Sequence, residues 1–126
     1  MEKYLNSKIY KIEPINGEKG DIYIGSTSET LLKKRLASHI TGFKRWKDGK
    51  RGKVSSFDLF EKYGVDKCTI VLIELINASS IYELKLKEAY YIKSLDCINK
   101  IIPLRSLKEY YQDNRIAYIE KVKIYN

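Results

Sequence analysis

The chain has 126 residues, 44% of them apolar and 32% charged, which is typical of one globular domain with one hydrophobic core. Lysine and arginine number 24 against 16 aspartate and glutamate residues, and the net charge of +8 favours a polyanionic partner such as nucleic acid. No apolar signal region opens the chain and no segment approaches the ~18 apolar residues of a membrane span, so we expect an intracellular protein, cytoplasmic or in the nucleoid or nucleus, neither secreted nor membrane-bound.

The first segments predict a β-hairpin. Residues 8–13 and 21–25 are short stretches rich in β-branched and aromatic side chains. Residues 14–20, which separate them, contain proline, asparagine and two glycines and therefore have strong turn chemistry.

A helix is expected next. Residues 26–29 form a possible capping box, with Ser26 or Ser28 as the N-cap, and the helix should run to about Gly42 or Trp46. Its predicted inner face carries four apolar residues: Leu32, Leu36, Ile40 and Phe43. Residues 47–53, which follow, are too polar and glycine-rich for a regular element and predict a basic loop.

The middle of the chain predicts a short helix and a buried strand. Ser55 or Ser56 can cap a helix that runs through Tyr63, and Gly64 should end it in a left-handed conformation. Residues 69–76 form a nearly continuous apolar run, which favours a central strand covered on both faces.

The helix expected over residues 80–95, opened by a capping box at Ser80, carries an unusual residue. At about 100° per residue, Glu88 lies in the middle of an apolar stripe. The stripe consists of Ile81, Leu84, Tyr91, Ile92 and Leu95. Because burial of an unpaired carboxylate is costly, Glu88 should bind a metal, pair with a buried cation or border a cleft.

These elements predict a small α/β (α+β) domain with the order β-β-α-α-β-α. We expect a three-stranded, mostly antiparallel sheet flanked by helices. The domain should span residues 1–102, and residues 103–126 should form a C-terminal helical tail, with Leu104, Leu107 and Tyr111 on one side. The tail could dock on the domain, contact DNA or support a homodimer.

Several further residues could take part in chemistry. Arg35 and His39 lie four apart and so share one face of the first long helix, while Tyr10 and Tyr23 lie on the two hairpin strands. Taken singly, each has an ordinary interpretation, because border histidines and packed tyrosines are common and the chain has eleven tyrosines. Gly25, directly after the second strand, would allow close approach to the backbone.

Taken together, the segments Lys8-Ile9-Tyr10, Tyr23-Ile24-Gly25 and Arg35-Leu-Ala-Ser-His39, followed by Glu88 and Asn99, form a known pattern. The chain resembles the GIY-YIG endonuclease family from about Lys8 to Asn99. The resemblance is greatest to the compact catalytic modules of homing endonucleases and of stand-alone viral and phage members. Two departures are the lysine at position 8, where the family has glycine, and the lack of a second histidine after the first long helix.

The resemblance implies a metal-dependent endonuclease that hydrolyses DNA phosphodiester bonds. In such enzymes Tyr10 would be the candidate general base, and Tyr23 would position the water or the phosphate. Arg35 would stabilise the transition-state charge, with His39 in support. Glu88 would be the protein ligand of one divalent cation, Mg²⁺ or Mn²⁺, and Asn99 would hold the site together by hydrogen bonds.

Basic residues near the site are candidate substrate contacts, because phosphate contacts dominate affinity for nucleic acids. The candidates, together with Gly25, are Lys8, Lys33, Lys44, Arg45, Lys50, Arg51 and Lys53. The residues leave three alternatives open: a catalytically silent nucleic-acid-binding module, a nuclease for RNA or branched DNA, and a small interaction protein with a basic surface.

Overall fold

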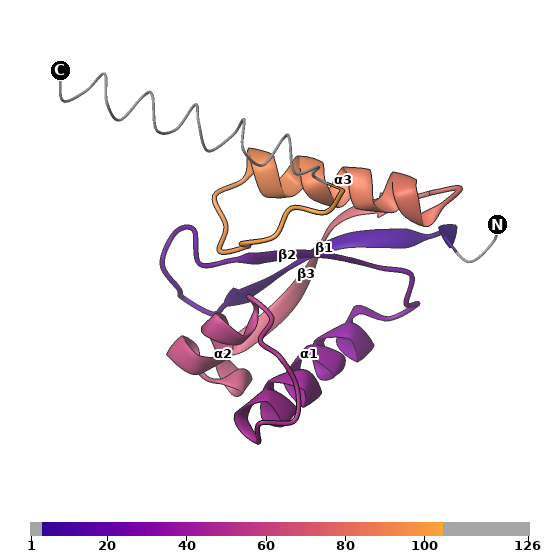
Figure 1. The fold of residues 1–126 in the computed structure, drawn as a ribbon. Coiled ribbons are helices and arrows are strands. Elements are labelled where there is room, and N and C mark those ends of the chain that lie inside the picture. The colour runs from indigo at the N-terminus through magenta and orange to yellow at the C-terminus, as the bar shows by residue number, and fades with distance from the viewer. Residues whose placement is uncertain (1–3, 105–126) are drawn as a thin grey trace, which may run out of the picture.

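The computed structural model of the protein describes residues 4–104. Along these residues the elements occur in the predicted order β-β-α-α-β-α (Figure 1). Their bounds are β1 Ser7–Pro14, β2 Tyr23–Thr27, α1 Leu32–Lys47, α2 Phe57–Tyr63, β3 Cys68–Ile76 and α3 Ile81–Ser94, with a 3₁₀ turn at Val65–Lys67. The tail predicted beyond Leu104, including Leu107 and Tyr111, lies outside the described residues.

The sheet has three strands in the order β2-β1-β3, and both pairings are antiparallel. The prediction that β3 is a central strand was therefore wrong: β1 is central and β3 is an edge strand. Leu72 and Leu75 of β3 are about half exposed, at 46% and 54%. A continuous apolar run cannot distinguish a central strand from an edge strand, because the run records side-chain type and not the number of neighbouring strands.

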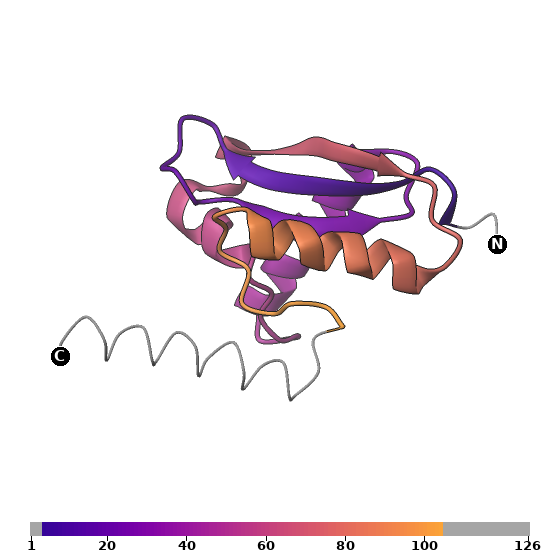
Figure 2. The ribbon, with the colours of Figure 1, turned by 90° about the horizontal axis from the view of Figure 1, so that it is seen from above.

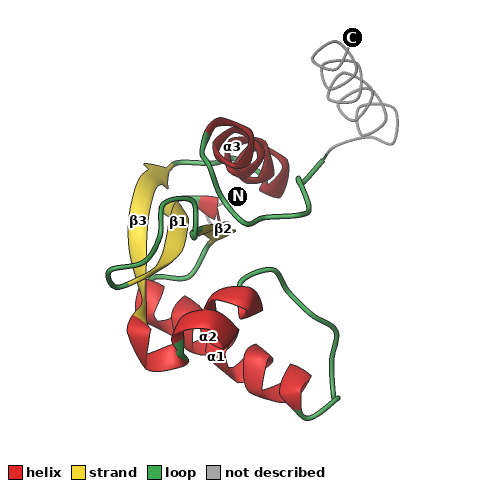
Figure 3. Cartoon of the chain, turned by 90° about the vertical axis from the view of Figure 1, so that its left-hand side faces the viewer, coloured by secondary structure: helices red, strands yellow, loops and turns green. Residues whose placement is uncertain are grey.

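Helices cover both faces of the sheet, α3 on one face and α1 with α2 on the other (Figure 3). Viewed from above, α3 extends alongside the strands (Figure 2). Successive residues of a strand point to opposite faces, so Ile9 packs into a core beneath α3 while Tyr10 and Ile12 pack into a core with α2. The predicted inner residues of α1 pack against this second core. Among the described residues, no helix is long and apolar enough to cross a membrane.

The start of α1 differs from the prediction. Strand β2 continues through Ser26 and Thr27, which pair with Ile9 and Lys8 of β1, so neither Ser26 nor Ser28 caps a helix. Leu31 occupies the N-cap position and makes no side-chain cap bond. Pairing with β1 places Ser26 and Thr27 in the sheet, where the backbone hydrogen bonds between strands stabilise the fold more than one helix cap would.

The other helix ends are closer to expectation. Ser80 accepts a hydrogen bond from the backbone N–H of Glu83, as its capping box predicts. Ser56 precedes α2 but its side chain makes no cap bond, and Gly64 ends α2 with a positive φ of 94° but a ψ of 147°, outside the left-handed helical region. Ile81 and Leu95 of the predicted stripe are 47% and 40% exposed, whereas Glu88 is buried with only 8% exposure.

The outer edge of β2 is covered by the segment that follows α3. The N–H of Ile98 donates to the carbonyl of Ile22, 2.9 Å away. The amide of Asn99 then accepts a hydrogen bond from the N–H of Ile24 and donates one to its carbonyl, both at 2.8 Å. One asparagine side chain thus replaces a neighbouring strand, which satisfies backbone groups that an open edge would leave unpaired.

Candidate active site

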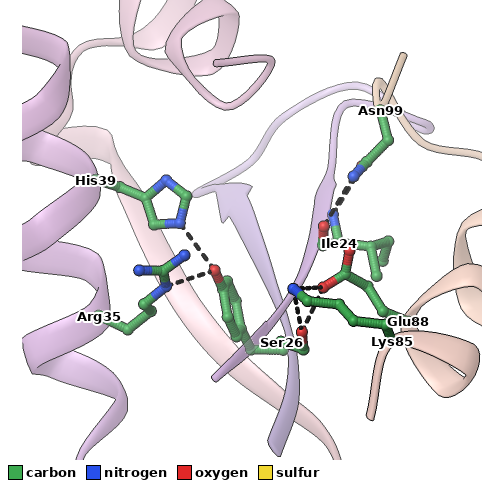
Figure 4. A network of polar contacts seen from close by, with 8 residues as sticks. Ile24, Ser26, Arg35, His39, Lys85, Glu88 and Asn99 are labelled. Atoms are coloured by element: carbon green, nitrogen blue, oxygen red, sulfur yellow. Dashed lines mark hydrogen bonds and ion pairs between the residues drawn. The ribbon is translucent and has the colours of Figure 1, made fainter. Parts of the chain in front are cut away.

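A chain of hydrogen bonds links β1, α1 and the residue before α2. The Nε–H of Arg35 donates to the Tyr10 hydroxyl at 3.0 Å, and that hydroxyl lies 2.8 Å from Nε2 of His39 (Figure 4). Nδ1 of His39 lies 2.9 Å from the Ser56 hydroxyl. Each ring nitrogen of His39 therefore has a hydroxyl partner, Tyr10 at Nε2 and Ser56 at Nδ1.

In this chain of hydrogen bonds, burial and nearby charges favour the neutral forms of the Tyr10 phenol and the His39 imidazole. Burial lowers the pKa of His39 to about 4, and the positive charges of Arg35 and Arg51 act in the same direction. Burial raises the pKa of Tyr10 despite the opposing effect of Arg35. Arg35 is the neighbouring cation that a tyrosine base would need, but the effect of burial on the pKa of Tyr10 is larger than that of Arg35.

Gly25 lies directly opposite Tyr10 in the β1–β2 pair. A Cβ atom at position 25 would lie 2.4 Å from both Cζ and the hydroxyl oxygen of Tyr10. The close approach expected at this glycine is therefore made by the Tyr10 ring, which is fully buried. Gly25 thus determines where the Tyr10 hydroxyl meets Arg35 and His39.

Replacement of Gly25 by alanine is expected to lower the free energy of unfolding by about 3 kcal/mol, because the methyl group overlaps a ring that has no free space to enter. The intrinsic conformational preference raises the free energy of unfolding slightly, since alanine is favoured over glycine within a strand. Denaturant titration measures the change. Gly52→Ala is the matched control, since beyond its two chain neighbours no atom lies within 4 Å of its added Cβ. Equal stability of the two variants would contradict this packing.

Glu88 approaches the edge of β2 from the other face of the sheet. Its Oε1 accepts hydrogen bonds from the Ser26 hydroxyl at 2.5 Å and from Nζ of Lys85 at 3.3 Å (Figure 4). Lys85 also donates to Ser26, at 3.1 Å. No partner within residues 4–104 binds Oε2. The buried carboxylate therefore has one oxygen held by the protein and one available. It borders a cleft, as one of the expected explanations has it, and its cation, Lys85, is half-buried where a buried cation was expected.

Two adjoining cavities lie along this edge. The first, which we call the cleft, has a volume of about 380 Å³. It is lined by Tyr23, Lys53, Val54, Ser55, Glu88, Asn99, Lys100, Ile101 and Pro103. The second, which we call the arginine cavity, has a volume of about 350 Å³. It is lined by Tyr23, Arg35, Ser38, His39, Arg51, Val54 and Phe57.

Tyr23 lines both cavities, as Val54 does. Its ring makes an edge contact with His39, with centroids 5.3 Å apart. Burial raises its pKa far above the usual value, so the phenol stays neutral. No described residue hydrogen-bonds the Tyr23 hydroxyl. Of the two predicted tyrosines, Tyr23 therefore faces the cavities, while Tyr10 lies behind Arg35 and His39.

The structure brings the six predicted catalytic residues to one region, but it scatters the predicted substrate contacts. Lys53 and Arg51 line the cavities, whereas Nζ of Lys8 donates to the carbonyls of Asn6 and Glu29 and lines neither. Lys8 therefore does not line the cleft or the arginine cavity. The remaining basic candidates are exposed and line neither cavity: Lys33, Lys44, Arg45 and Lys50.

Three polar residues of the site were missed at the level of sequence. Ser26 and Ser56 were interpreted as helix caps, and nothing local indicates that they bind Glu88 and His39 instead. Lys85 had a usable signal, because it lies three residues before Glu88 and so shares its face of α3.

A search of solved structures finds a mutant of the catalytic domain of intron endonuclease I-TevI, with a TM-score of 0.55 and 23% sequence identity. The match covers 76% of this chain and 94% of that domain. No family model and no curated protein matches the chain. The similarity confirms the fold class and the resemblance at the level of fold: the chain has a GIY-YIG-like fold.

Proposed function

We propose that the protein is a metal-dependent endonuclease that hydrolyses DNA phosphodiester bonds at the cleft and the arginine cavity. One observation carries this proposal: a buried carboxylate, Glu88, and a guanidinium, Arg35, reach the same edge of β2 from opposite faces of the sheet, on either side of Tyr23. The name of the similar solved structure, an intron endonuclease, supports a nuclease.

Arg35 would stabilise the charge that develops on the phosphate. Its Nε is held by Tyr10, and it forms no ion pair with any described carboxylate, so its remaining N–H groups are free for phosphate oxygens. A donor positioned before the reaction costs little reorganisation when charge develops. Tyr10 and His39 act here as positioning residues, since both ring nitrogens of His39 already have partners.

Tyr23 would position the attacking water. Its neutral hydroxyl has no described partner, and Tyr23 lines both the cavity that contains Arg35 and the cleft that contains Glu88. A phenol with a strongly raised pKa is a hydrogen-bond donor and acceptor but a poor base, so we assign Tyr23 to orientation.

Glu88 fits a divalent cation that takes few protein ligands. Within residues 4–104 no group of three or more His, Cys, Asp or Glu side chains could hold a metal, so Glu88 would act with water and phosphate oxygens, as Mg²⁺ sites commonly do. The available Oε2 is the ligand atom, while Ser26 and Lys85 hold Oε1. A bound Mg²⁺ or Mn²⁺ would neutralise phosphate charge and assist the leaving oxygen.

The proposal is tested with supercoiled plasmid, incubated with the wild-type protein in Mg²⁺, in Mn²⁺ or with a chelator. We expect nicked or linear product with either cation and none with the chelator. Labelled RNA and branched DNA in parallel reactions identify a different nucleic-acid substrate. Salt-sensitive DNA binding without cleavage of any substrate would contradict the nuclease and favour a binding module.

A further inference from the structure

Arg51 differs from the other cations of the basic loop in its surroundings. Lys47 and Lys53 form ion pairs with Glu61 and Asp58 of α2. Arg51 pairs with none of the carboxylates that the structure describes, and it lines the arginine cavity together with Arg35. No carboxylate lines this cavity, so two guanidinium groups share it without a counter-ion.

Arg51 contacts its own loop and both helices beside it. Its Nε–H donates to the Gly52 carbonyl, 3.2 Å away. Its guanidinium lies over the ring of Phe57, 5.5 Å from the centroid, and against Gly42 of α1. A Cβ at position 42 would lie 2.8 Å from Nη1 of Arg51 and 3.3 Å from Cζ of Phe57, so a side chain there would displace the guanidinium. Glycine is otherwise unfavourable inside a helix. The contact with Arg51 is a packing reason for glycine at position 42.

Arg51 also connects the arginine cavity to a further hollow along α1. This hollow, of about 320 Å³, is lined by Ala37, Ser38, Thr41, Gly42, Arg45 and Arg51. Ser38 and Arg51 line both spaces, and here too no carboxylate is among the lining residues. Cationic surface therefore continues from the site along α1 towards Arg45.

We propose that Arg51, for which Gly42 leaves room, is a second phosphate-binding residue, which contacts a phosphate next to the one at Arg35 and directs the nucleic-acid strand along α1. This inference rests on the proposed function. Of the seven basic candidates, only Arg51 lines the arginine cavity beside Arg35: Lys53 lines the cleft and pairs with Asp58, and the other five line neither the cleft nor the arginine cavity. A guanidinium suits the task, since its planar N–H groups match phosphate oxygens.

The test uses Gly42→Ala, which moves the guanidinium without removing it. Binding of a labelled DNA duplex in chelator is measured by fluorescence anisotropy against salt concentration, beside thermal unfolding. We expect Arg51→Ala to weaken binding by about 10-fold and to reduce the log–log salt slope by about 1, as loss of one phosphate contact does. Gly42→Ala keeps the charge and should weaken binding by a smaller factor. Thermal unfolding of each variant shows whether a loss of binding is a loss of folded protein.

The double variant and a control separate this inference from alternatives. In the Arg51→Ala background, Gly42→Ala should weaken binding no further. Gly52→Ala should bind as the wild type does, since its Cβ meets no atom within 4 Å beyond its two chain neighbours and the Gly52 carbonyl that accepts from Arg51 is kept. Wild-type binding by Arg51→Ala would overturn the role of Arg51 while leaving the nuclease intact, and additive losses in the double variant would overturn the link between Gly42 and Arg51. Absence of wild-type binding to any nucleic acid would overturn both proposals.

Discussion

Alanine at position 88 should reduce plasmid cleavage by about 10³-fold, equivalent to roughly 4 kcal/mol of transition-state stabilisation. The loss follows from removal of Oε2, the one carboxylate oxygen that is available at the cleft. Binding of Mn²⁺, followed by electron paramagnetic resonance, should be lost together with cleavage. DNA affinity in chelator should not fall, because removal of a negative charge cannot weaken contact with phosphate.

Glu74→Ala provides the matched control for Glu88→Ala. Glu74 is also a carboxylate held by a hydroxyl and a lysine, Tyr91 and Lys87, but it lines neither the cleft nor the arginine cavity. Cleavage by Glu74→Ala should stay near the wild-type rate. The assignment of Glu88 fails if Glu88→Ala keeps both Mn²⁺ binding and cleavage, or if both carboxylate variants lose activity equally through loss of folded protein.

Acidification should destabilise the fold through His39. The pKa of His39 in the folded protein is about 4, below the ordinary value of 6.5, so between these values the unfolded chain binds a proton that the folded protein does not. The stabilising contribution is complete above pH 6.5 and is lost as the pH falls towards 4. The difference amounts to about 3 kcal/mol in the free energy of unfolding.

Denaturant titrations at intervals from pH 7 to pH 5 measure this effect. Interpretation is direct in this range because His39 is the only histidine of the chain, while the carboxyl groups of Glu74 and Glu83, whose pKa values are lowered, titrate at lower pH. His39→Gln should be less stable at pH 7 but nearly independent of pH down to 5. A wild-type stability that is level over the same range would mean that His39 is not buried as a neutral ring.

Periodicity alone was sufficient for the element order and for the burial of Glu88. A carboxylate centred in an apolar helical stripe must be buried wherever that helix packs, because the angular position of a side chain is set by the helix itself. The same reasoning was wrong for Ile81 and Leu95, which are largely exposed. They lie at the first turn and just beyond the last residue of α3, where a helix extends past the sheet it covers.

The sequence did not reveal which strands pair or which strand lies at an edge of the sheet. Ser26 looked like a helix cap because its local sequence satisfies a capping box, yet pairing with Ile9 keeps it in β2. The apolar run of β3 gave no indication that it lies at an edge. In each case the deciding interaction joins residues far apart in the chain, and local propensity contains no information about it.

The sequence by itself determined the residue types of the site, their order and the helical faces that carry Arg35, His39 and Glu88. Tertiary structure alone decided that Tyr10 lies behind Arg35 while Tyr23 faces the cavities, that Ser26 and Lys85 hold one oxygen of Glu88, and that Gly42 leaves room for Arg51. The reason is that side-chain direction follows from local backbone geometry, whereas the group that a side chain meets depends on how sheet and helices pack against each other.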